Sequence, residues 1–230
     1  MKKGNMYEFV DIKWNPLAGE CFHRCGYCST ESFKRYPGCK TKYSGLPRID
    51  ENQISKNLGK DKFVFVVSQN DLFACDVKKE IIDEIVYRCR KSDSTFLFQT
   101  KNPFRLHEML NDILFPEKSI FCITLESNRH YKDKMGFAPS PFHRYLSIVD
   151  IRKEFPKLDF HVTIEPIMNF DLKAFVEILR VIMPSQVNIG ADSKRNNLIE
   201  PSKDKILALI AELEKFTKVV QKSNLKRLLK

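Results

Sequence analysis

Short runs of apolar, β-branched and aromatic residues recur along the chain, and longer stretches with helical spacing separate them. The runs predict six strands, over 7–14, 62–68, 94–100, 119–125, 159–164 and 186–190. Helices are expected over about 76–90, after Pro103, near 141–154 and 172–182, and over about 203–216. Strands that alternate with helices in this order predict a parallel sheet with helices outside it.

The second and third runs are almost continuously apolar (VFVV and FLF), which is typical of strands covered on both faces. Six strand–helix units fit an open doubly wound sheet or an incomplete (βα) barrel, and periodicity does not separate the two. In either fold, functional residues collect at the carboxyl ends of the strands. The chain has no repeat or obvious linker, so we expect one domain over 1–230, with a core at about 7–216 and a basic, helix-prone tail at 217–230.

The composition is that of a globular protein. Hydrophobic residues make up 43% of the 230 residues and charged residues 30%, which excludes a disordered chain. No apolar run reaches the roughly 18 residues of a membrane span, and no signal peptide is recognisable, so we expect a cytoplasmic protein without membrane contact. The net charge of +10 would attract a phosphate backbone, but lysine-rich surfaces are common, and charge alone argues only weakly for such a partner.

Three of the seven cysteines lie within eight residues, with the spacing C-x3-C-x2-C. Clustered cysteines in a reducing compartment indicate metal binding or catalysis rather than disulfides. Thiolates from Cys21, Cys25 and Cys28 can hold three positions of a four-iron cluster and leave one iron open for a small molecule. The alternative is a zinc-stabilised nucleic-acid-binding module without catalysis, in which Cys39 or His23 supplies the fourth ligand. Zinc knuckles favour two C-x2-C units, and only one is present here, which argues against the zinc alternative.

The cysteine spacing, with Tyr27 before the last cysteine and a predicted strand before the loop, resembles the radical S-adenosylmethionine (radical SAM) superfamily. The resemblance implies a partial (βα)6 TIM barrel, a 4Fe-4S cluster on the three cysteines and SAM bound to the open iron. It also implies a one-electron reductant such as flavodoxin or ferredoxin. One electron then cleaves SAM to methionine and a 5′-deoxyadenosyl radical, which abstracts hydrogen from a substrate.

Two further segments resemble a phage and bacterial radical SAM family of unknown function. One strand ends in Ser-x-x-Asp-Leu-Phe from Ser68, and the next ends in Thr-Lys-Asn-Pro from Thr100. The resemblance covers about residues 9–215 and is strongest before residue 105. A more distant resemblance is to the spore photoproduct lyase family, radical SAM enzymes that repair DNA.

The superfamily resemblance also assigns residues to SAM by position along the strands. It implies that Ser68 and Asp71 contact the amino group, that Lys101 faces the carboxylate, and that Glu126 accepts from the ribose hydroxyls. The remaining candidates for the same pocket are Tyr27, Thr163, Glu165 and Gly190, the last because it lets the backbone approach the adenine.

The substrate is the least constrained part of the hypothesis. Basic charge and the likeness to a DNA-repair enzyme favour a nucleic acid or nucleotide, and a small metabolite or peptide is the alternative. Asn128, Arg129 and Tyr131 open a loop that suits base stacking or a lid, although helix capping explains the first two equally well. Cys75 is a candidate hydrogen-atom donor to a substrate radical, or an idle cysteine.

Overall fold

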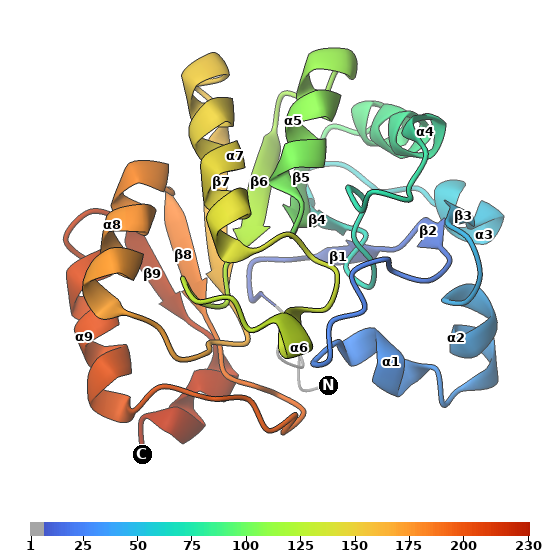
Figure 1. Ribbon diagram of the computed structural model, residues 1–230. Coiled ribbons are helices and arrows are strands. Elements are labelled where there is room, and N and C mark those ends of the chain that lie inside the picture. Colours follow the sequence, from blue (N-terminus) through green and yellow to red (C-terminus); the bar gives the residue numbers. More distant parts are fainter. Residues whose placement is uncertain (1–6) are drawn as a thin grey trace.

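A seven-stranded parallel sheet forms the centre of the computed structural model, which describes residues 7–230 (Figure 1). Its order is β1-β4-β5-β6-β7-β8-β9, the order of the strands along the chain. Because the order never reverses, the sheet curls in one direction instead of winding both ways from a switch point, and the fold is an α/β partial barrel. The strands are β1 Ile12–Trp14, β4 Phe63–Val66, β5 Thr95–Thr100, β6 Ser119–Thr124, β7 Asp159–Ile164, β8 Gln186–Ile189 and β9 Lys218–Gln221.

Long helices follow the strands and lie along the outside of the sheet (Figure 1). They are α4 Lys79–Arg90, α5 Pro103–Asp112, α7 Pro141–Glu154, α8 Leu172–Ile182 and α9 Lys203–Leu213. The side chains of Asn102, Ser140 and Ser202 accept backbone N–H groups at the starts of α5, α7 and α9, and a proline occupies the first turn of α5 and α7.

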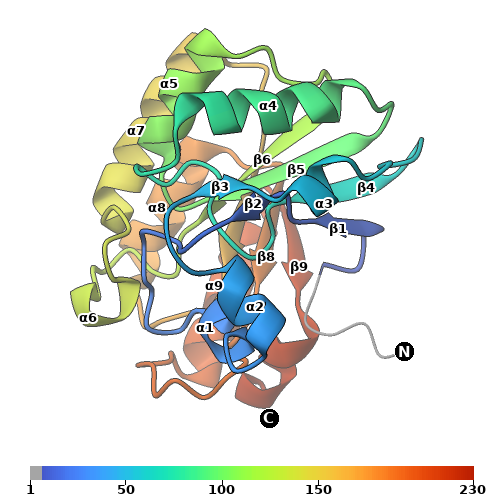
Figure 2. The same ribbon diagram turned by 90° about the vertical axis from the view of Figure 1, so that its right-hand side faces the viewer.

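Short elements occupy the connections. They are α1 Ser29–Phe33, α2 Pro37–Lys42, α3 Glu51–Ile54, α6 Lys132–Met135, the pair β2 Leu17–Ala18 and β3 Arg48–Ile49, and the 3₁₀ helix η1 Ser223–Leu228. In both views α4 and α5 lie at one end of the molecule, and α1, α2 and α6 lie toward the other (Figure 1, Figure 2). No helix within residues 7–230 is long and apolar enough to cross a membrane.

The two faces of the sheet differ in chemistry because successive strand residues point to opposite sides. Outward side chains such as Val64, Phe98 and Val162 are fully buried in the main apolar core under the helices. The alternate, inward positions are partly polar, as at Gln99 and Thr124. Toward the amino ends the interior is filled by a second apolar cluster of Tyr7, Val10, Phe65, Leu97 and Cys122. The barrel therefore has a packed floor and a polar upper half.

Several predicted elements are confirmed with the same bounds, namely the strand over 159–164 and the helices over 141–154 and 172–182. The first strand is shorter than predicted because Tyr7 and Val10 leave the sheet and pack across its inner face. The prediction of a helix-prone tail holds only in part, because Ser223–Leu228 form the 3₁₀ helix η1 but the residues before it form a strand. Residues Lys218–Gln221 form β9 parallel to β8, so the sheet has a seventh strand, and the packed core continues past residue 216 to Leu225.

Candidate functional site

A cavity of about 560 Å³ lies where the carboxyl ends of the strands meet. Its size falls in the range of small-molecule sites. Side chains reach it from the loop that carries the three clustered cysteines (residues 19–28), from α1, from β1, β4, β5, β6, β7 and β9 or the residues directly after them, and from the loop after β8. Among the described lining residues, six are Lys or Arg and four are Asp or Glu.

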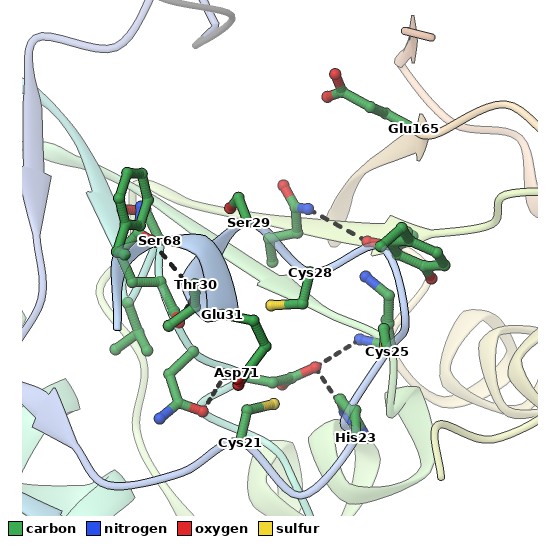
Figure 3. A pocket seen from close by; sticks show the side chains of 18 of the residues that line it. Cys21, His23, Cys25, Cys28, Ser29, Thr30, Glu31, Ser68, Asp71 and Glu165 are labelled. Atoms are coloured by element: carbon green, nitrogen blue, oxygen red, sulfur yellow. Dashed lines mark hydrogen bonds and ion pairs between the residues drawn. The ribbon is translucent and has the colours of Figure 1, made fainter. Parts of the chain in front are cut away.

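Cys21, Cys25 and Cys28 all line this cavity as free thiols, and Figure 3 shows them around one space. Two turns shape the loop: the N–H of Arg24 donates to the carbonyl of Cys21, and the N–H of Cys28 donates to that of Cys25. Burial raises the pKa of the Cys21 thiol, and the negative charge of Asp71 adds to the rise. Burial also raises the pKa of Cys25. These thiols therefore carry protons unless a metal replaces them.

The donor set suits a soft metal centre. Three sulfurs from one loop match the thiolate ligation of iron–sulfur clusters, whereas hard cations select oxygen ligands. Within residues 7–230, no group of three or more His, Cys, Asp or Glu side chains is already arranged around the position of a single metal ion. Cys39, the alternative zinc ligand, lies on α2 and is not among the lining residues.

The back of the cysteine loop rests on α6 and the turn after it. Cys25 Sγ lies 3.4 Å from the carbonyl oxygen of Met135, and the N–H of Gly26 donates to that of Lys134 at 2.9 Å. Gly136 has a φ of 62°, and a Cβ added there would lie 2.2 Å from the carbonyl oxygen of His23. Only glycine allows this close approach.

Asp71 ties the cysteine loop to the ends of β4 and β5. Its Oδ2 lies 2.9 Å from His23 Nε2, and its carboxylate accepts from the Thr100 hydroxyl at 2.7 Å. It also accepts the backbone N–H groups of Lys101 and Phe73, at 2.8 and 3.0 Å. Burial alone would raise the pKa of Asp71, but these partners, His23 foremost, outweigh it and lower the pKa. The carboxylate is thus occupied with protein partners, although it lines the cavity.

Tyr27 and Glu126 belong to a buried charge network beside the cysteines. The Tyr27 hydroxyl donates to Glu126 Oε1, and Arg144 Nη1 donates to Glu126 Oε2 at 2.7 Å. Lys101 Nζ lies 3.8 Å from Glu126 Oε1 and 5.6 Å from the centre of the Tyr27 ring. Burial would raise the pKa of Glu126, but Arg144 and then Lys101 outweigh it and lower the pKa to about 2.

Of the four residues in this charge network, two line the cavity and two do not. Tyr27 and Lys101 line it, whereas Glu126 and Arg144 are fully buried behind them. The structure therefore gives Glu126 protein partners in place of the ribose hydroxyls that were predicted for it. Ser68 does line the cavity, and its hydroxyl donates to Asn15 Oδ1 at 3.1 Å.

Glu165 lies on the wall across from the cysteines (Figure 3). It forms an ion pair with Lys222 and accepts from Asn224 Nδ2 at 2.9 Å. Lys222 Nζ in turn lies 4.3 Å from the ring centre of Tyr7. A Cβ on Gly190 would lie 2.7 Å from Glu165 Oε1, so the glycine makes room for this carboxylate, and Gly190 does not itself line the cavity.

The remaining predicted residues are not brought into the cavity. Thr163 is fully buried in the inner face of β7. Asn128 Oδ1 accepts the N–H of Asp171, the N-cap residue of α8, and Arg129 forms an ion pair with the same Asp171. These two residues anchor their loop to the start of α8. Tyr131 and Cys75 also lie outside the cavity lining: the Tyr131 hydroxyl donates to the carbonyl of Asn169, and Cys75 is exposed.

Several lining residues carry no motif and were missed by sequence reasoning. Lys13 could have been found, because it alternates with Ile12 and Trp14 and so points to the inner face of β1. Lys194, in the loop after β8, places its Nζ 5.6 Å from the ring centre of Phe33. Other missed lining residues are Tyr7, Lys34, Tyr43 and Gln99.

Neither a protein-family model nor a curated protein matches the chain. Solved structures do share its fold. A doubly substituted spore photoproduct lyase with bound AdoMet and dinucleoside spore photoproduct has a TM-score of 0.63 at 10% identity, over 96% of this chain and 80% of that chain. Streptococcus suis SuiB bound to S-adenosylmethionine has a TM-score of 0.52 at 8% identity, over 92% and 50%. SuiB bound to precursor peptide SuiA gives 0.53 at 8% identity, over 92% and 48%. The chain thus spans about half the length of SuiB.

Proposed function

We propose that this protein is a radical SAM enzyme. The observation that carries the proposal is the position of Cys21, Cys25 and Cys28, three free cysteines of one loop that all line one cavity at the carboxyl ends of a partial barrel. Solved structures of the same fold, at 8–10% identity, contain AdoMet. The seven cysteines, all free thiols, also suit a reducing cytoplasm.

The three cysteines would hold a 4Fe-4S cluster with one open iron for the methionine end of SAM. Such a cluster, when bound and reduced, would provide the electron that cleaves SAM to methionine and a 5′-deoxyadenosyl radical. Lys101 reaches the same cavity from the end of β5, and its ammonium group suits the SAM carboxylate. Ser68 offers a hydroxyl from the end of β4. Asp71 acts as a positioning residue, because its carboxylate links His23 of the cysteine loop to the sheet.

The side of the cavity formed by Glu165 and Lys222 would receive the substrate, because the cysteines occupy the facing side. The apolar floor around Tyr7 and Phe65 closes the interior below it. A radical generated in this space would thus be shielded from water on one side by packed side chains.

A nucleic acid or nucleotide is the substrate class that we favour. Six Lys or Arg against four Asp or Glu line the cavity, and aromatic rings of Tyr7, Phe33 and Tyr43 lie among them. Cations suit phosphates, and aromatic rings stack on bases. Among the ion pairs of residues 7–230, none involves Lys13 or Lys194, so both cations remain available for an anion. The fold is also that of a protein solved with a dinucleoside.

Anaerobic reconstitution with iron and sulfide tests the cofactor. We expect about four irons and four sulfides per chain and, after reduction with dithionite and addition of SAM, formation of 5′-deoxyadenosine. Alanine variants of Cys21, Cys25 and Cys28 should lose the iron, whereas Cys39→Ala and Cys75→Ala should retain it. A colourless protein that takes up zinc, or iron retained after loss of any of the three cysteines, would contradict the proposal.

Binding across a salt series tests the substrate class. We expect single-stranded DNA and dinucleotides to bind, with an affinity that falls steeply as salt rises. Lys13→Glu and Lys194→Glu should weaken binding, while Lys60→Glu, an exposed charge before β4 and outside the lining, should not. Negligible binding of single-stranded DNA and dinucleotides even at low salt would contradict a nucleic-acid or nucleotide substrate. SuiB, a solved structure of the same fold, was determined with a bound precursor peptide, so binding of a basic and of an acidic peptide is measured in parallel to test the peptide alternative.

A further inference from the structure

Residues 32–49, which run from the end of α1 through α2 to β3, carry charge of a single sign. The segment contains no Asp or Glu, and its five charged residues are all basic: Lys34, Arg35, Lys40, Lys42 and Arg48. A surface segment of this composition attracts anions.

Most of this positive charge is not neutralised by neighbouring acids. Lys34 pairs with Glu31 at 2.7 Å, and Lys42 pairs with Asp50 at 2.6 Å. The other three cations have no carboxylate partner among the residues that the structure describes: Arg35, Lys40 and Arg48. Of these, Arg35 and Lys40 are exposed side chains of the loop before α2 and of α2 itself. A phosphate group would therefore reach both cations without first displacing an acid.

An exposed aromatic ring lies among these cations. Tyr36 is 51% exposed, and the guanidinium carbon of Arg35 lies 4.8 Å from its ring centre. Arg35 Nη2 also donates to the Tyr36 hydroxyl at 2.9 Å. Cations interleaved with exposed rings suit single-stranded nucleic acid, because the rings stack on bases while the cations contact phosphates. We call Arg35, Tyr36 and Lys40 together the α1–α2 rim.

The α1–α2 rim borders the cavity without being part of its lining. Phe33 and Lys34 before it and Tyr43 after it line the cavity, whereas none of its three members does. In both views α1 and α2 lie next to each other (Figure 1, Figure 2). Lys194, from the loop after β8, places its Nζ 5.6 Å from the ring centre of Phe33 and so adds a further cation at this side of the cavity. A nucleotide in the cavity and its neighbours along a strand would thus meet one continuous basic and aromatic surface.

We propose that the α1–α2 rim binds the nucleotides that flank the one in the cavity, so that the substrate is a single-stranded polynucleotide rather than a free nucleotide. The inference rests on the proposed function, because it takes a nucleotide as the occupant of the cavity. Arg35 and Lys40 contact phosphates, and Tyr36 stacks on a base. An acidic peptide shares the charge of a nucleic acid but has no bases to stack, so the contribution of Tyr36 distinguishes the two.

Affinity as a function of strand length is the test. A dinucleotide and a 12-nucleotide single-stranded DNA are titrated into the reconstituted protein by calorimetry at several salt concentrations. We expect the 12-mer to bind more tightly, with a slope of log affinity against log salt that is steeper by about 1.4, as for two further phosphate contacts. Tyr36→Ala should raise the Kd of the 12-mer about tenfold, and Arg35→Gln and Lys40→Gln should each raise it and reduce the slope by about 0.7. All three variants should leave the affinity for the dinucleotide unchanged, because these side chains do not line the cavity.

The chain offers matched controls for both kinds of change. Tyr87 on α4 is 48% exposed and has Lys91 Nζ 4.6 Å from its ring centre, so Tyr87→Ala removes a similar ring beside a similar cation elsewhere. Lys60→Gln removes an exposed charge outside the cavity and the rim. Equal losses in Tyr36→Ala and Tyr87→Ala, equal salt slopes for the dinucleotide and the 12-mer, or an acidic peptide that is weakened as much as the 12-mer by Tyr36→Ala would overturn the inference. Failure of the proposed function is seen separately, as a protein that takes up no iron and sulfide or that binds no dinucleotide even at low salt.

Discussion

Arg144 is a fully buried guanidinium whose removal should be among the most destabilising single changes in the molecule. It donates to Glu126 Oε2 at 2.7 Å, to the Thr124 carbonyl at 2.8 Å and, through Nε, to the Pro139 carbonyl at 2.7 Å. Both members of the ion pair are 0% exposed. The variant Arg144→Met keeps most of the apolar volume but removes the charge and the three donors.

The magnitude follows from the shifted pKa and the lost hydrogen bonds. The pKa of Glu126 is lowered from 4.5 to about 2 by Arg144 and Lys101 against the effect of burial, and a shift of that size corresponds to about 3 kcal/mol at neutral pH. Two carbonyl groups that lose a donor add about 1 kcal/mol each. We therefore expect Arg144→Met to reduce the free energy of unfolding by about 3–5 kcal/mol, which is the range for breaking a buried pair. The midpoint temperature should fall by roughly 10 °C or more.

Urea unfolding is the appropriate assay, followed by circular dichroism and by the fluorescence of Trp14, the single tryptophan, which is 1% exposed in the core. The folded pKa of Glu126 lies below its ordinary value, so its contribution is complete above about pH 4.5 and is lost as the pH falls toward about 2. The gap between wild type and Arg144→Met should accordingly narrow from pH 7 to pH 3.5. The double variant with Glu126→Gln should be less destabilised than the sum of the single ones. A loss below about 1 kcal/mol, a gap that does not change with pH, or strict additivity would refute the reasoning.

Three further predictions concern the cysteine loop, its supports and the residues that line the cavity. Gly136→Ala should destabilise the protein by about 2 kcal/mol or more, because the added Cβ would overlap the cysteine loop. Gly38→Ala is the matched control: Gly38 lies in α2 with open space around it, so this change should stabilise the protein by about 0.5–1 kcal/mol. Urea unfolding measures the free energy of unfolding of both variants. Asp71→Asn should speed the release of iron to a chelator from the reconstituted protein, since an amide cannot accept all of the present donors; an unchanged release rate would show that Asp71 does not position the loop. Lys222→Met should lower the midpoint temperature by several degrees because it removes the buried partner of Glu165, and Lys222→Arg should restore most of the loss.

The strands and helices were predictable where periodicity and end signals agree. Pro103 and Pro141 stand at the first turn of α5 and α7, and the apolar spacing of α8 persists over its full length. The segment Lys218–Gln221 has no such signal, because its four residues form a strand only by pairing with β8. Contacts of this kind depend on the rest of the fold, and a local pattern does not contain them.

The site was predictable in its position along the chain but not in the roles of its acidic residues. Sequence reasoning placed Glu126 and Glu165 at strand ends, and both are there. It could not distinguish the carboxylate that lines the cavity, Glu165, from the one that faces Arg144 behind it. Nor could it foresee that Arg129 would pair with Asp171, 42 residues away. The partner of a charge is set by three-dimensional packing, which spacing does not encode.

The cavity depends on segments that lie before β1 and after β9. These two strands are the edges of the sheet and are not hydrogen-bonded to each other. The gap is bridged by side chains, because Lys222 contacts the ring of Tyr7 and pairs with Glu165, while the Tyr7 hydroxyl donates to Gln99 at 2.7 Å. A closed barrel would fix this wall through backbone pairing, but side-chain contacts are weaker and can be exchanged for contacts with a ligand. The wall beside Tyr7 and Lys222 is therefore closed across this gap by side-chain contacts, whereas the cysteine loop is held by backbone contacts to α6 and the turn after it.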